Sequence, residues 1–159
     1  MDGDVVSVER VIPAPADKIF ELIADPTMHP QIDGSGTVKQ AKNGGGQPLA
    51  LGSSFGMSMK LGIGYSMVNT VVEFEQGRRI AWQARPPGVM GKFTAGRIWR
   101  YELEPVEGGT RVVESWDVSQ DHQRRLLKVG PVPEKTRTNM EKTLERIEQL
   151  VTSEGQGSA

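Results

Sequence analysis

The first thirty residues change from strand spacing to helical spacing. Residues 5–12 alternate between apolar and polar positions, with Val6, Val8 and Ile12 on one face, which predicts a half-buried strand. Prolines at 13 and 15 end that strand, and an apolar stripe at helical spacing follows within residues 16–23. The Asp-Pro pair at 25–26 ends this helix and begins a second, shorter one that Pro30 stops.

Turn sequences then recur at intervals typical of hairpins. They are DGSG, NGGGQP, GIG, QG, PPGVMG and EGG. Between them, six runs rich in β-branched and aromatic residues each predict a strand, at about 37–42, 50–61, 65–75, 79–85, 92–104 and 110–118. Because the connections are short, neighbouring runs are expected to pair antiparallel.

After Ser119 the spacing becomes helical again. The segment QDHQRRLLKV predicts a turn or two, and Pro133 begins a long helix in which Met140, Leu144, Ile147 and Val151 share a face. Residues 1–152 therefore predict one domain, and 153–159 a disordered tail. Since one long helix must cover the sheet, the order predicts an α+β fold: a curved seven-stranded antiparallel sheet around the C-terminal helix, with two short helices after the first strand.

Three motifs in this order resemble a known superfamily. The segments IPAPADKIFELIADPTMHP, EFEQGRRIAW and EGGTRVVESWD are similar to those of START-like, birch-pollen-allergen-like proteins, in their polyketide cyclase/dehydrase and lipid transport branch (SRPBCC). The resemblance implies a helix-grip fold with an apolar cavity between sheet and C-terminal helix. Relatives often carry tryptophan at the position of Ile32, by the expected pocket entrance, so this chain departs from the commoner pattern there.

Composition narrows the classes of function. The chain holds 19 basic and 20 acidic residues and no cysteine, a balance that points to neither nucleic acid nor an anionic membrane and excludes disulfides and thiolate zinc sites. No apolar run approaches the roughly 20 residues of a membrane span, and the acidic N-terminus does not resemble a signal peptide. We therefore expect a cytoplasmic protein, a monomer or weak dimer, with no membrane insertion.

Alternation places a set of aromatic and methionine side chains on the inward face. One interpretation is simple core packing; the other is the lining of a ligand pocket, because three indoles and a tyrosine side by side exceed what a solid core usually needs. The expected lining residues are Phe55, Met57, Met59, Met67, Trp82, Trp99, Tyr101, Trp116, Met140 and Leu144. The face of residues 65–75 stays ambiguous, since both parities are apolar.

Two charged residues fall on the same apolar parity. Arg97 and Glu114 lie in neighbouring predicted strands, where a charge needs a partner or water. They form either a structural ion pair or rim position, or the polar end of the pocket. Both are included among the expected ligand-binding residues.

The remaining motifs carry little chemistry. GSSFG, with Ser54 at its centre, matches a nucleophile elbow, but it runs into a strand without the required helix. Two histidines cannot build a common catalytic zinc site, so no metal and no cofactor are expected; His29 is expected at the rim and His122 beside a solvated basic helix. Catalytic residues stay unassigned.

Three functions follow in order. The first is binding of a small hydrophobic or amphipathic molecule, such as a lipid, polyketide or aromatic metabolite. The second is a polyketide aromatase/cyclase-like enzyme in which Arg97 steadies an enolate and Glu114 or Tyr101 moves protons. The third is a protein-interaction module.

Overall fold

A computed structural model gives the arrangement of the chain. It describes residues 1, 3–35, 38–42, 49–61 and 63–157, with side chains for 1, 3–35, 49–58, 65–89, 91 and 93–153. The elements are β1 (Val5–Ile12), α1 (Ala16–Ile23), η1 (Pro26–Met28), α2 (His29–Ile32), β2 (Val38–Lys42), β3 (Ser54–Leu61), β4 (Ile63–Glu75), β5 (Arg79–Arg85), η2 (Val89–Lys92), β6 (Ile98–Val106), β7 (Gly109–Asp117), α3 (Arg124–Leu127) and α4 (Val132–Gly157).

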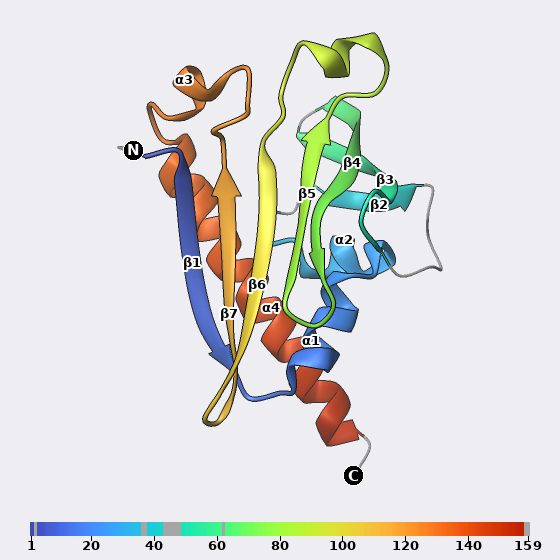
Figure 1. Cartoon of the computed structure of the whole chain (residues 1–159), viewed down its shortest axis with the longest axis vertical. Coiled ribbons are helices and arrows are strands. Elements are labelled where there is room, and N and C mark those ends of the chain that lie inside the picture. The colour runs from blue at the N-terminus through green and yellow to red at the C-terminus, as the bar shows by residue number, and fades with distance from the viewer. Residues whose placement is uncertain (2, 36–37, 43–48, 62, 158–159) are drawn as a thin grey trace.

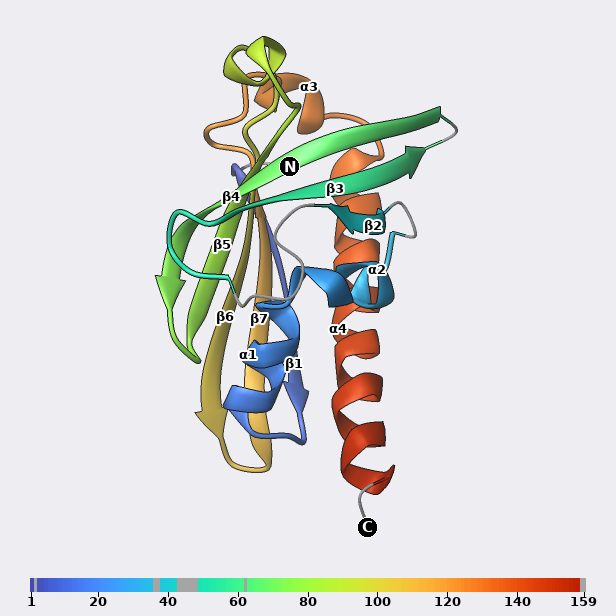
Figure 2. The ribbon, with the colours of Figure 1, turned by 90° about the vertical axis from the view of Figure 1, so that its right-hand side faces the viewer.

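The strands of the described part of the chain form one antiparallel sheet. Their order is β1-β7-β6-β5-β4-β3-β2, so β1 closes onto β7 although the two are far apart in sequence. Helix α4 runs along the sheet (Figure 1), and Figure 2 shows α1, α2 and α4 on the same side of it. This confirms the predicted α+β fold, with one antiparallel sheet and a long C-terminal helix.

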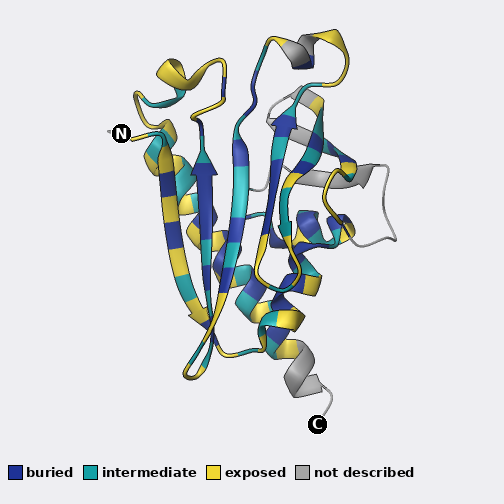
Figure 3. Ribbon diagram, viewed as in Figure 1, coloured by how far each residue is buried: buried dark blue, intermediate teal, exposed yellow. Residues whose placement is uncertain are grey.

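The core lies between the inner face of the sheet and these helices. Helix α4 buries the predicted stripe of Met140, Leu144, Ile147 and Val151, and buried and exposed positions alternate along β1 (Figure 3). Each fully buried aliphatic or phenylalanine side chain stabilises the fold by about 1.5–3 kcal/mol. Hydrophobic burial on this one face therefore holds the long helix against the sheet.

The predicted strand over 92–104 is wrong at its N-terminal end. Strand β6 begins only at Ile98, because Ala95 (φ 59°) and Gly96 (φ 116°) adopt left-handed backbone conformations that no strand contains. The chain makes a short 3₁₀ turn and a corner before the strand starts. As a result Phe93 is exposed.

A β-bulge explains the ambiguous face of residues 65–75. The register between β4 and β5 shifts between Val71, which faces Trp82, and Glu73, which faces Ala81. Val72 is the extra residue, so the inward parity changes there. Asn69 and Val71 are buried before the bulge, and Phe74 packs on the core after it. Both apolar parities are therefore used, one on each side of the bulge.

Two further boundaries differ from the predictions. Strand β3 begins at Ser54 rather than near 50, because Gly52 (φ 83°) lies in a turn closed by the Ser53 N–H donating to Ala50 O at 3.0 Å. Helix α4 continues to Gly157, through most of the segment predicted as a disordered tail. Glycine weakens a helix interior by about 1 kcal/mol without forbidding it.

Candidate functional site

The inner face of the sheet carries two rows of cross-strand neighbours. In the first row Trp82 lies opposite Trp99, and Trp99 lies opposite Trp116. In the second row Tyr101 lies opposite Glu114. Directly opposed residues of antiparallel strands share a face, so the three tryptophans share the inner face as the alternation predicted.

Tyr101 and Glu114 form a buried hydrogen-bonded pair. The tyrosine hydroxyl donates to Glu114 Oε1 at 2.9 Å, and the glutamate side chain belongs to a residue only 3% exposed. Glu114 Oε2 is buried with no hydrogen-bond partner among the described residues. A buried polar atom without a partner costs about 1–3 kcal/mol. This oxygen is therefore the polar feature of the inner face that the fold itself leaves unsatisfied.

Burial changes the protonation of this pair. Removal from water raises the pKa of Glu114 to about 8; the hydrogen bond from Tyr101 opposes this rise, and the charge of Asp33 adds to it. Burial also raises the pKa of Tyr101 well above its usual value, with the nearby Glu114 adding to the effect. At neutral pH both groups are therefore mainly protonated, and Glu114 is a carboxylic acid rather than a carboxylate.

His29 completes an aromatic cluster beside the pair. Its ring stacks on Trp82 with centroids 4.9 Å apart and meets Phe55 edge-on at 5.3 Å. Trp82 in turn lies 5.7 Å from Tyr101. The prediction of His29 as a rim residue is wrong, since the residue is 6% exposed. His29 and Ile32 are three apart on one short helix, so both turn toward the sheet.

His29 is held as a neutral imidazole. Burial lowers its pKa to about 4, against smaller opposing effects from the Ile23 carbonyl, Asp25 and Asp33. The ring nitrogen Nε2 lies 2.8 Å from Ile23 O. A carbonyl oxygen can only accept, so Nε2 carries the proton and Nδ1 keeps a free lone pair. The cluster thus holds a protonated carboxyl and a neutral imidazole, with Nδ1 unprotonated, on the same inner face.

The segment after α2 is anchored on α4 by a close backbone approach. The Gly34 N–H donates to Thr143 Oγ1 at 2.8 Å, and Arg146 donates to the carbonyl of Asp33. A Cβ atom at Gly34 would lie 2.2 Å from Asn139 O, which no side chain tolerates. Glycine therefore allows α2, with His29, to sit against both the sheet and α4.

The structure distributes the predicted pocket residues over three groups. Eight are buried on the inner face or on α4: Phe55, Met57, Trp82, Tyr101, Glu114, Trp116, Met140 and Leu144. Met67 and Trp99 are half-buried, and Met59 lies in β3 but outside the residues whose side chains are described. Ligand contact by any of them stays a prediction.

Arg97 is separate from this group. It precedes β6, and its Nε donates to Asp121 Oδ2 at 3.1 Å in an ion pair whose acid side chain is fully buried. The expectation that Arg97 lies within a strand is wrong, since β6 begins only at Ile98. Its side chain pairs with Asp121, whereas the carboxyl group of Glu114 accepts from Tyr101. The structural ion pair is the interpretation that its geometry supports.

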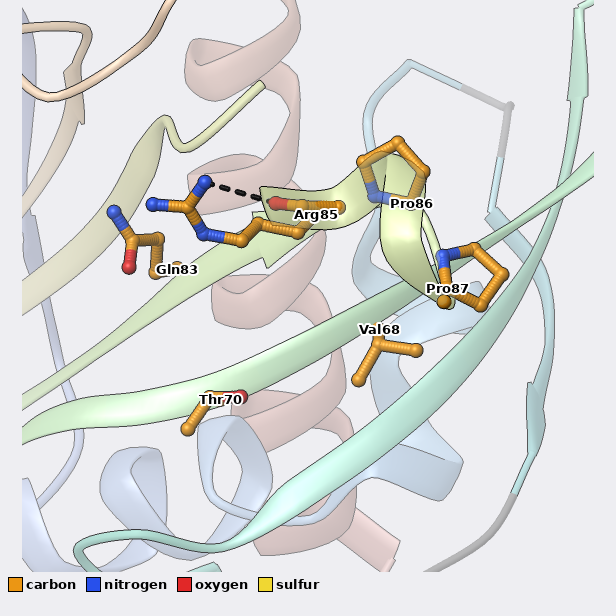
Figure 4. Close-up of a pocket in the computed structure, with 8 residues that line it drawn as sticks. Val68, Thr70, Gln83, Arg85, Pro86 and Pro87 are labelled. Carbon is orange, nitrogen blue, oxygen red and sulfur yellow. Dashed lines mark hydrogen bonds between the residues drawn. The ribbon is translucent and has the colours of Figure 1, made fainter. Parts of the chain in front are cut away.

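A pocket of about 500 Å³ opens on the opposite face of the sheet. Figure 4 shows Val68, Thr70, Gln83 and Arg85 lining it beneath the prolines of the β5–β6 connection. Thr70 and Gln83 are cross-strand neighbours, one position out of phase with Val71 and Trp82. Of the predicted lining residues whose side chains are described, none belongs to this pocket or to a smaller, charged one of about 210 Å³.

The described residues add little further chemistry. No group of three or more histidine, cysteine, aspartate or glutamate side chains is placed to hold a metal ion within that part of the chain. Nor is any helix of the described part long and apolar enough to cross a membrane.

The architecture and the comparison with known families indicate the same class of protein. The fold is a helix-grip fold, and residues 4–152 match the family of polyketide cyclase/dehydrase and lipid transport proteins. The chain belongs to this family.

The individual relatives are an uncharacterised protein and solved structures of low sequence identity. An uncharacterised protein of Mycobacterium tuberculosis, Rv0088, is 33% identical over 119 residues, which are 70% of this chain and 46% of the relative. The chain thus spans about half the length of this relative. A crystal structure from Rhodobacter sphaeroides, 15% identical, superposes with a TM-score of 0.71 over 96% of both chains. DynU16, a protein of the dynemicin biosynthetic locus, is 17% identical with a TM-score of 0.64, covering 92% of this chain and 46% of its own.

Proposed function

We propose that the protein binds a small, mainly apolar molecule between the sheet and α4, with an oxygen acceptor of the ligand against Glu114. The observation that carries this proposal is the buried Oε2 atom of Glu114, which has no partner among the described residues. Membership of the family supports an interior site of this kind. A ligand that hydrogen-bonds this atom would remove the cost of leaving it unsatisfied.

The hydrogen-bond pattern selects the polar group of the ligand. Tyr101 donates to Oε1, so in the carboxylic acid the proton sits on Oε2, which then needs an acceptor. With a pKa of about 8, Glu114 is mainly protonated at neutral pH. A ketone, ester or hydroxyl oxygen fits this donor, whereas a ligand carboxylate would be desolvated without a counter-charge.

The apolar part of the ligand would lie against the aromatic rows. Among the apolar members of the predicted set with described side chains, Trp99 and Met67 are only half-buried, and methionine adapts easily to a new neighbour. Because most of the predicted lining residues pack together in one buried core cluster, we expect the ligand to displace side chains as it enters. We therefore expect binding to change tryptophan fluorescence.

Fluorescence titration tests the proposal. A panel of fatty acids, flavonoids and polyketide mimics is titrated into wild type, Glu114→Gln and Glu114→Leu. Glutamine keeps an N–H donor at the position of the acid, so Glu114→Gln retains binding of carbonyl-bearing compounds, while Glu114→Leu weakens it by about tenfold. Equal affinity of wild type and Glu114→Leu would contradict the assigned contact.

One observation favours an enzyme as the second candidate. A neutral carboxylic acid with a pKa of about 8 can polarise a ketone and share its proton with a developing enolate, as polyketide cyclisation requires. The test is the product distribution of a poly-β-ketone with and without the protein. Products that Glu114→Gln leaves as in wild type would argue against a proton-moving role.

A further inference from the structure

One end of the molecule is built from two segments that lie side by side. Residues 85–97 connect β5 to β6, and residues 119–133 lead from β7 through α3 into α4; two perpendicular views place both at the same end (Figures 1 and 2). The backbone N–H of His122 donates to Ala95 O at 3.1 Å and joins them. We call these two segments together the α3 end.

The α3 end exposes large apolar side chains. Phe93 and Leu126 are each 69% exposed, Val89 is 72% exposed and Val129 is 59% exposed. Two of these residues come from each segment. Scattered apolar side chains on a surface need no explanation, but several together at one end indicate a contact surface.

The α3 end also holds an excess of basic residues, although the chain as a whole is nearly neutral. Six of the 19 basic residues and one of the 20 acidic residues lie in these two segments, which gives them a net charge of +5 and the rest of the chain −6. The near-neutral total hides this separation. A field of this shape orients the protein toward a negatively charged surface.

Several of these cations are available for an external partner. Arg124 and Arg125 are exposed and have no carboxylate partner among the described residues, and Arg85 donates only to the Gly91 carbonyl, at 3.0 Å, in the described contacts. Two of the six cations are paired: Arg97 with the buried Asp121 at 3.1 Å, and Lys128 with Asp4 at 3.0 Å. The positive charge offered to a partner is therefore that of Arg85, Arg124 and Arg125.

We propose that the α3 end docks on an anionic lipid bilayer. The arginines lie next to lipid phosphates, while Phe93 and Leu126 enter the boundary between headgroups and acyl chains. Nucleic acid would use the charge and leave the apolar tips in water. The contact is a shallow surface attachment and is independent of any ligand at Glu114.

Vesicle co-sedimentation tests this docking. The full chain is mixed with vesicles of phosphatidylcholine alone and with vesicles of phosphatidylcholine and phosphatidylglycerol in equal parts. We expect binding to the mixed vesicles that falls as salt is added, and little binding to the neutral ones. Absence of binding to the mixed vesicles, or equal binding to both, would overturn the proposal.

Matched variants test the surface itself. Arg124→Glu and Arg78→Glu change the net charge equally, but Arg78 lies in the β4–β5 turn, outside the α3 end. Only Arg124→Glu should therefore weaken binding to the mixed vesicles. We expect a loss of about tenfold or more, since each cation near such a surface contributes about 1 kcal/mol. Leu126→Ser should likewise weaken binding several-fold. Its control is Leu51→Ser, which should leave binding unchanged, because Leu51 is 66% exposed but lies in the turn before β3. Equal effects within either pair would refute the assignment. A dimer in sedimentation velocity that Leu126→Ser abolishes would assign the surface to a second copy instead.

Discussion

The buried acid at the centre of the site makes stability depend on pH in an unusual direction. The pKa of Glu114 rises from 4.5 in the unfolded chain to about 8 in the folded protein. The native state therefore binds more protons than the unfolded state between these values, and the free energy of unfolding falls as pH rises. Below pH 4.5 the acid is neutral in both states and carries no such cost.

The magnitude follows from the size of the shift. Each pH unit between the two pKa values removes about 1.4 kcal/mol, so between pH 6.5 and pH 8 Glu114 alone lowers stability by about 2 kcal/mol. The buried His29, whose pKa falls from 6.5 in the unfolded chain to about 4, changes stability mainly below pH 6.5 and so contributes little in this window. Glu114→Gln removes the ionisable group and keeps the shape and hydrogen-bonding capacity of the side chain.

Urea unfolding followed by tryptophan fluorescence at both pH values measures the effect. The difference in unfolding free energy between Glu114→Gln and wild type should grow by about 2 kcal/mol in favour of the variant from pH 6.5 to pH 8. Other groups cancel in this difference because both proteins contain them. Parallel pH profiles of the two proteins would refute the burial of a protonated acid at this position.

Three further substitutions test other parts of the account. His29→Phe keeps a ring on Trp82 but cannot be protonated. In wild type, this histidine should lower the free energy of unfolding by about 3 kcal/mol as pH falls from 6.5 to 4. That loss should be absent from the acid unfolding curve of the variant. Gly34→Ala should destabilise by about 2 kcal/mol or more because its Cβ meets the backbone of α4, while Gly3→Ala, with open space around it, should have no measurable effect on the melting temperature. Arg97→Leu removes the ion-pair partner of the buried Asp121 and should cost about 2 kcal/mol in urea unfolding. Arg111→Leu, in an exposed ion pair, should leave the unfolding curve close to that of wild type; equal effects would contradict the structural role assigned to the first pair.

The sequence predicted the elements better than their irregularities. Turn residues and alternation identified each strand region, because these signals are local. The bulge at Val72 and the left-handed corner at Ala95 depend on how neighbouring strands and loops meet. Each shifts the chain by a residue or turns it away, and so changes which side chains face inward.

The site was predicted in part for the same reason. Tyr101 and Glu114 follow directly from strand parity, and both were expected on the inner face. His29 was misplaced because one short helical turn carries too little pattern, although the spacing to the apolar Ile32 indicated a shared face. The charge of the α3 end was invisible in the total because it needs two segments, 85–97 and 119–133, to be recognised as neighbours.

Native mass spectrometry of freshly purified protein tests the central claim most directly. Wild type and Glu114→Leu are isolated from the same cells and sprayed under identical conditions. We predict that wild type carries a bound small molecule whose released mass fits a mainly apolar compound with a carbonyl or hydroxyl oxygen, and that Glu114→Leu has lost most of it. Two results would contradict ligand binding at Glu114. One is that both proteins show only the mass of the chain without a ligand, and the other is that both carry the same adduct at the same occupancy.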